Sequence, residues 1–166
     1  MNEIASRMKT AGFAAALIAA GVALSAIWFG GKSGDAQDSM HKNLSRLLSD
    51  RQAIASELVA PPYAEAGKSP LEAYLLRIRR DGVPQHSGMR RKLAQLAEDN
   101  AQILALAEAY EPFAKSPDYP TQLRALRTYV ITWNDRWYSV FETFMAGGNL
   151  AGGEPPFPEG LMAKPE

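Results

Sequence analysis

Hydrophobic residues recur in steps of three and four along three long segments of the chain, and this period predicts α-helices. The segments cover about 36–60, 87–111 and 120–146, and in each the apolar positions form a heptad seam of the kind through which helices pack side by side. The seam residues are Met40, Leu44, Leu47, Arg51, Ile54 and Leu58 in the first segment, Met89, Leu93, Leu96, Asn100, Ile103, Ala107 and Tyr110 in the second, and Leu123, Leu126, Val130, Trp133, Trp137, Val140 and Phe144 in the third.

A shorter helix is predicted over 70–81. Ser69 stands at the N-cap position, Pro70 at the first helical position, and Glu72 completes a capping box. Its apolar stripe consists of Leu71, Tyr74, Leu75 and Ile78. The three long helices have matched lengths of about 37 Å and short connections. The fold class expected for 36–146 is therefore all-α, an antiparallel bundle of three long helices plus one short helix.

The segment 11–29 contains nineteen consecutive uncharged residues. This length suffices for a helix to cross a bilayer, and Trp28 and Phe29 at its end suit the membrane interface. We therefore predict a single N-terminal transmembrane helix at 11–29, in contact with membrane lipid, followed by a linker at 30–35.

The charged residues before this segment bear on its orientation. Arg7 and Lys9 precede it in the short tail 1–10, and basic flanks favour the cytoplasmic side. The expected location is a bacterial inner membrane, with 1–10 in the cytoplasm and the bundle in the periplasm. One alternative is a signal peptide cleaved after Ser25, which would release the bundle as a secreted protein, and another is a buried helix of a soluble protein.

Small residues repeat every four positions along the predicted span. Such ridges let transmembrane helices pack closely, which predicts contact with other membrane-protein subunits. The competing explanation is that alanine is simply frequent in this chain. The residues in question are Gly12, Ala16 and Ala20 on one ridge and Ala15, Ala19 and Ala23 on the other.

Two polar residues interrupt the heptad seams. Arg51 and Asn100 each lie near the middle of a long helix, and the two helices are expected to be antiparallel neighbours. We predict that they share a buried polar layer, which usually fixes helix register at a cost in stability. A ligand site is the alternative.

The helix predicted at 120–146 carries apolar residues over an arc wider than one bundle face requires. The outlying positions are candidates for docking a partner protein, because exposed apolar patches commonly mark interfaces. The alternative is that bulky aromatic side chains fill the core on both sides of the helix. The candidate docking residues are Ile131, Tyr138, Phe141 and Met145.

A cluster of basic residues lies around the connection between the short helix and the next long one. It can meet an acidic partner surface at the end of the bundle far from the membrane, or it is a solvated run of charges. The cluster consists of Arg77, Arg79, Arg80, Arg90, Arg91 and Lys92.

Composition argues against several kinds of chemistry. The formal net charge is zero, which gives no support to nucleic-acid binding. The chain lacks cysteine, which excludes disulfides and thiolate metal sites. Its two histidines, His41 and His86, lie far apart without helix-spaced carboxylates. We therefore expect a protein that is not an enzyme and that has neither a metal nor another cofactor.

The C-terminal segment 147–166 is rich in glycine and proline and shows no period, which predicts a flexible or extended tail. The stretch Glu154–Pro158 suits binding in an extended form on a partner's surface, with a disordered terminus as the alternative.

These features favour a non-catalytic accessory subunit of a multi-subunit inner-membrane complex. One span would anchor the chain, and the extracytoplasmic bundle would dock partner subunits. The alternatives are a membrane-tethered periplasmic sensor or ligand-binding helical module, and a secreted helical chaperone-like protein if the N-terminus is cleaved.

Overall fold

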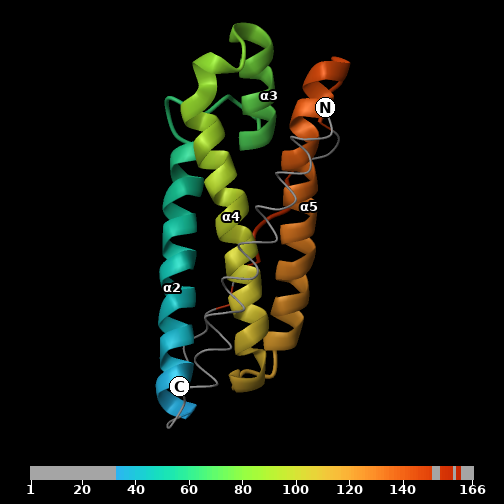
Figure 1. The fold of residues 1–166 in the computed structure, drawn as a ribbon. Helices are drawn as coiled ribbons and strands as arrows, with labels where there is room; N and C mark the ends of the chain where they lie inside the picture. The colour runs from blue at the N-terminus through green and yellow to red at the C-terminus, as the bar shows by residue number, and fades with distance from the viewer. Residues whose placement is uncertain (1–32, 151–153, 159, 162–166) are drawn as a thin grey trace, which may run out of the picture.

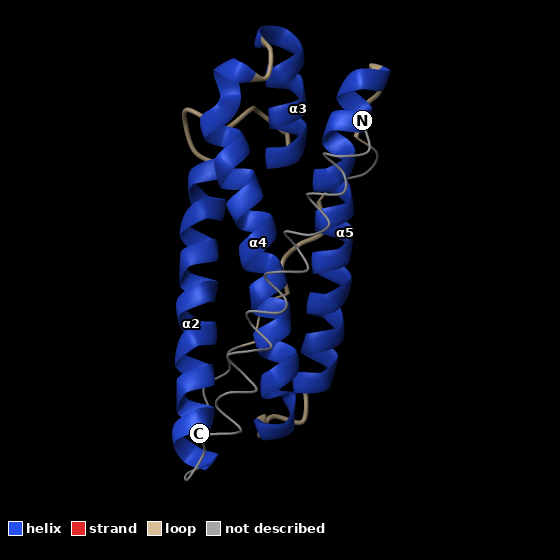
Figure 2. Ribbon diagram, viewed as in Figure 1, coloured by secondary structure: helices blue, strands red, loops and turns tan. Residues whose placement is uncertain are grey.

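The computed structural model describes residues 33–150, 154–158 and 160–161, and within these ranges the chain forms helices and no strands (Figures 1 and 2). Each helix starts and ends within about three residues of its predicted bounds. The helices are α2 (Ser33–Leu58), α3 (Pro70–Asp81), α4 (Ser87–Tyr110) and α5 (Tyr119–Ala146), with short 3-10 turns η1 (Pro84–His86) and η2 (Glu111–Phe113).

The long helices α2, α4 and α5 alternate in direction, and α4 packs against both of the others (Figure 1). The short helix α3 packs on α5 and α4 at the end of the bundle where α2 finishes. The prediction of a helical bundle with three long helices and one short one is confirmed for the described residues.

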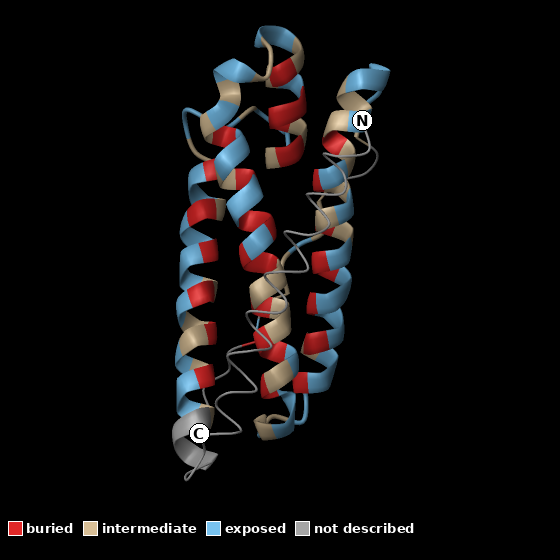
Figure 3. Ribbon diagram, in the orientation of Figure 1, coloured by how far each residue is buried: buried red, intermediate tan, exposed pale blue. Residues whose placement is uncertain are grey.

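The core is formed by the predicted seams. Every seam residue is buried except Phe144, which is partly buried and packs against the others (Figure 3). Trp133 and Tyr74 are the largest fully buried side chains. The heptad spacing therefore identified the faces that the long helices bury.

Local capping defines both ends of α3 and the end of α5. The Ser69 hydroxyl accepts a hydrogen bond from the Glu72 amide, and the Glu72 carboxylate accepts one from the Ser69 amide, as the capping box requires. Gly82 ends α3. Gly147 ends α5 with a φ of 69°, a left-handed conformation that glycine adopts without steric cost.

The described part of the tail packs on the bundle. Glu154, Pro155, Phe157 and Pro158 are partly buried, and Leu161 is buried in the core. The sequence predicted a tail that is either flexible or extended, and the described tail residues lie against the chain's own helices.

The predicted span at 11–29 lies outside the described residues. Among the helices that the structure does describe, none is both long enough and apolar enough to cross a membrane.

Candidate functional site

The structure brings Arg51 and Asn100 together in a buried polar layer, as predicted. Arg51 is 5% exposed and Asn100 is fully buried. The Arg51 Nε donates a hydrogen bond of 2.8 Å to the Asn100 Oδ1, and its Nη2 donates one of 2.6 Å to the Tyr129 hydroxyl. One guanidinium thus connects α2 with both α4 and α5.

The tail covers this layer with an aromatic ring. The Arg51 Cζ lies 3.7 Å from the centroid of the Phe157 ring, a cation–π arrangement. The Phe157 and Tyr129 rings meet edge to face with centroids 5.0 Å apart. Burial raises the pKa of Tyr129 above its ordinary value, which keeps the phenol neutral.

Asp99, the residue before Asn100, carries a buried carboxyl group. Asp99 is buried, and its Oδ2 has no hydrogen-bond partner among the described residues. Burial, with smaller contributions from Glu98 and Asp50, raises the pKa of Asp99 from 3.8 to about 6. The folded protein therefore holds a proton on Asp99 at pH values where the unfolded chain releases it.

This raised pKa predicts a pH dependence of stability that Asp99→Asn removes. Because the folded state binds the proton more tightly, the wild type should lose stability relative to Asp99→Asn as the pH rises from about 4 to about 6. A shift of this size corresponds to about 2–3 kcal/mol. Urea unfolding of both proteins at several pH values measures the difference, and parallel pH profiles would contradict the assignment.

The tail also completes the N-terminus of α3. The Leu71 amide donates a hydrogen bond of 2.9 Å to the Glu154 Oε1, and the Trp133 Nε1 donates one of 3.0 Å to the Glu154 Oε2. The first turn of a helix leaves amides without partners and favours negative charge. One carboxylate therefore joins the tail to α3 and to α5.

Three of the predicted docking residues form a line on the outside of α5. Ile131 is 54% exposed, Tyr138 45% and Met145 80%. They follow one another at intervals of seven residues, so they lie on one side of the helix about two turns apart. We call these three residues the outer stripe.

The fourth predicted docking residue, Phe141, packs inward instead. Its ring meets Tyr74 edge to face at 6.2 Å and Trp137 at 6.1 Å, and the Arg90 guanidinium lies 5.2 Å from its centroid. Phe141 lies to one side of the outer stripe on the helix, toward α3 and α4. It belongs to the core at that end of the bundle.

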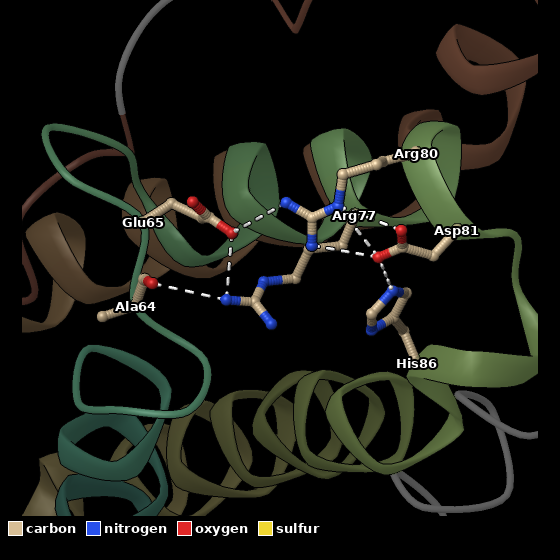
Figure 4. A network of polar contacts seen from close by, with 6 residues as sticks. All are labelled: Ala64, Glu65, Arg77, Arg80, Asp81 and His86. Atoms are coloured by element: carbon tan, nitrogen blue, oxygen red, sulfur yellow. Dashed lines mark hydrogen bonds and ion pairs between the residues drawn. The ribbon is translucent and has the colours of Figure 1, made fainter.

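Most of the predicted basic patch is paired within the fold. Arg77 and Arg80 form ion pairs with Glu65, and Arg77 also donates to the Ala64 carbonyl (Figure 4). Lys92 forms an ion pair with Glu57. The remaining members differ: Arg79 donates to the carbonyl groups of Thr143 and Gly148, Arg90 covers Phe141, and Arg91 is exposed.

His86 and Asp81 form the one close histidine–carboxylate contact that the structure describes. The His86 Nε2 lies 2.9 Å from the Asp81 Oδ2, and the same carboxylate accepts from Arg80 (Figure 4). These hydrogen bonds, from Arg80 and then from His86, lower the pKa of Asp81. The contact joins the end of α3 to η1 and stabilises this turn.

The remaining predicted site residues cannot be placed. The small-residue ridges at positions 12–23 and the interface residues Trp28 and Phe29 lie outside the described residues. Within the part of the chain that the structure describes, no three histidine or acidic residues gather in a way that would hold a metal ion.

Comparison with known proteins found no match: no protein-family model, curated protein or solved structure is similar to this chain. The parts that sequence reasoning missed are Tyr129 as the third member of the polar layer, and Glu154 and Phe157 as residues that bind the bundle. The signal in the sequence was the spacing of Glu154 and Phe157, an acidic and an aromatic residue three positions apart in a proline-rich tail.

Proposed function

We propose that this chain is a non-catalytic accessory subunit of a multi-subunit bacterial inner-membrane complex, and that it docks a partner subunit through the outer stripe of α5. The observation that carries the proposal is the spacing of Ile131, Tyr138 and Met145. A single exposed apolar residue is ordinary on a protein surface, but three in a heptad line match the seam by which one helix packs on another.

The proposal places the bundle beside a membrane. The segment 11–29 would cross the bilayer with its N-terminus in the cytoplasm, and its small-residue ridges would pack on neighbouring spans. Because α2 begins at Ser33, its first turn would lie close to the membrane surface. The 26 residues of α2 would then carry α3 and the basic residues about 39 Å away.

In this arrangement the protein would act by holding the bundle next to its partner subunit. Tethering beside a complex raises the effective concentration of the bundle at its partner, so a modest stripe of three apolar side chains is sufficient for stable association. The partner would present a helix with apolar residues at the same seven-residue interval.

The test is the triple variant Ile131→Lys, Tyr138→Lys and Met145→Lys in the full chain, purified in mild detergent. We expect it to lose a partner that co-purifies stoichiometrically with the wild type. Its melting temperature should change little, because exposed substitutions usually alter stability by less than about 0.5 kcal/mol. Native mass spectrometry of both preparations measures the loss.

A matched variant controls for added charge. Thr121→Lys, Ala125→Lys and Ala146→Lys place three lysines on exposed positions of the same helix outside the stripe, and this variant should retain the partner. Retention of the partner by the stripe variant would contradict docking through α5. A wild-type chain that migrates as a lone monomer would contradict the accessory-subunit role itself.

A further inference from the structure

Methionine is the side chain through which this protein is most readily oxidised. The chain has six methionines and no cysteine, so thioether sulfur atoms are the groups that react first with a peroxide. The structure describes three of these methionines, Met40, Met89 and Met145. A dissolved oxidant must reach the sulfur atom, so burial decides which of the three reacts.

Met145 differs from the other two described methionines in its exposure to solvent. Its side chain is 80% exposed, whereas Met40 and Met89 are 4% and 1% exposed in the core. The indole rings of Trp133 and Trp137 are buried as well. Met145 is therefore the one exposed thioether in the part of the chain that the structure describes.

The end of α5 leaves the Met145 sulfur open to a small oxidant. Met145 lies in the last turn of the helix, and Ala146, Gly147 and Gly148 follow it at exposed positions. These three residues carry no side chain larger than a methyl group, and a Cβ built on Gly147 would have no atom within 4 Å. Oxidation of this sulfur therefore requires no opening of the fold.

Oxidation converts this apolar side chain into a polar one. Hydrogen peroxide transfers one oxygen atom to the sulfur, which loses two electrons. The S–O bond forms as the O–O bond breaks, and the remainder of the peroxide leaves as water. The product is a sulfoxide, whose oxygen accepts hydrogen bonds, and burying that oxygen against an apolar surface without a donor is unfavourable.

Met145 is also the most exposed member of the outer stripe. A helix that packs on the stripe would cover this side chain, and an unbranched thioether adapts its shape to an irregular apolar surface. The sulfoxide would lose that contact and would leave a polar oxygen in the interface. One side chain thus combines the accessibility that oxidation needs with a position in the predicted contact.

We propose that Met145 is a site of reversible oxidation by hydrogen peroxide, and that its conversion to the sulfoxide releases the partner from the outer stripe. The release step rests on the proposed function, whereas the oxidation of Met145 is a property of the chain alone. The reverse step belongs to a methionine sulfoxide reductase, in which two thiols become a disulfide and the oxygen leaves as water.

Peptide mapping by mass spectrometry measures the oxidation step. The full chain in mild detergent is treated with dilute hydrogen peroxide, and each of the six methionines is followed separately over time. We expect Met145 to be oxidised at least about ten-fold faster than Met40 and Met89, because the core covers their sulfur atoms. A rate at Met145 that is no greater than theirs, in a chain that circular dichroism shows to be folded, would overturn the site.

Native mass spectrometry measures the release step. The oxidised wild type should lose its stoichiometric partner, and treatment with methionine sulfoxide reductases and dithiothreitol should restore it. Met145→Leu keeps an apolar side chain without sulfur, so it should retain the partner before and after peroxide treatment. Met145→Gln is polar from the start and should bind the partner at least about ten-fold more weakly than the wild type does.

A matched variant moves the methionine away from the outer stripe. Met145→Leu combined with Ala125→Met places a methionine at an exposed position on the opposite side of α5. The new methionine should be oxidised while the partner is retained. Loss of the partner from this variant on peroxide treatment would show that another group is responsible, and it would overturn the release step.

The remaining outcomes separate this proposal from the docking proposal. Retention of the partner by a wild type whose Met145 is fully oxidised would overturn the release step, while docking through the outer stripe is judged by the lysine variant alone. A wild type without any partner would contradict the proposed function and the release step together. The oxidation rates of the chain alone would still decide whether Met145 is the modification site.

Discussion

Replacing Trp133 with alanine is expected to lower the free energy of unfolding by about 3–5 kcal/mol. Trp133 is fully buried at the centre of α5, so the substitution removes its contacts and leaves a cavity that the surrounding helices fill only in part. It also removes the hydrogen bond that the indole donates to Glu154. Urea unfolding followed by circular dichroism measures the loss, which is a large part of the stability of a domain of this size.

A second substitution at the same position separates packing from hydrogen bonding. Trp133→Phe keeps most of the aromatic surface but has no N–H group. It should therefore lower the free energy of unfolding clearly less than Trp133→Ala does, while it removes the hydrogen bond to Glu154. The hydrogen bond itself should account for about 1 kcal/mol. If both substitutions cost the same, the indole contributes chiefly through its polar contact, and the packing argument is wrong.

Replacing Arg51 with leucine is expected to cost about 2–4 kcal/mol of unfolding free energy. The substitution leaves the Asn100 Oδ1 without the donor that it has in a buried position, and it removes both the hydrogen bond to Tyr129 and the cation–π contact with Phe157. An apolar residue at a heptad position would ordinarily stabilise a bundle, so a loss here would show that the polar layer acts as a unit. Urea unfolding again measures the change.

Two further variants serve as controls for this prediction. Arg46→Leu alters an exposed arginine of the same helix, whose ion pair with Asp50 is at the surface, and it should change stability by less than about 0.5 kcal/mol. The triple variant Arg51→Leu, Asn100→Leu and Tyr129→Phe removes the whole layer and should recover most of the loss. A triple variant that is less stable than Arg51→Leu would contradict the view that unpaired polar groups cause the destabilisation.

The helices could be predicted from the sequence because their determinants are local. Heptad seams, the capping box at Ser69 and the left-handed glycine at Gly147 each act within a few residues, and each fixes a boundary or a buried face. The contact between Arg51 and Asn100 could also be predicted, because polar residues near the middle of two neighbouring antiparallel helices lie at similar heights in the bundle.

The tail and the ion pairs could not be predicted because their partners are remote. Leu71 and Glu154 are separated by 83 positions, and no periodicity in a segment rich in glycine and proline reports which surface it will contact. The sequence predicted a single basic patch because these residues are close to one another along the chain. In the fold, Glu57 and Glu65 approach them from the end of α2 and the connection that follows it, which divides the patch into separate pairs.

The bond between Leu71 and Glu154 has a consequence for the order in which the protein matures during synthesis. The N-terminus of α3 is made early, but the Glu154 carboxylate that accepts from its Leu71 amide is made 83 residues later. Contacts between distant parts of a chain form late, and chains mature from the N-terminus during translation. The helix pair α2 and α4 can therefore assemble on the nascent chain, whereas α3 and the layer around Arg51 are completed only after Glu154 and Phe157 have left the ribosome.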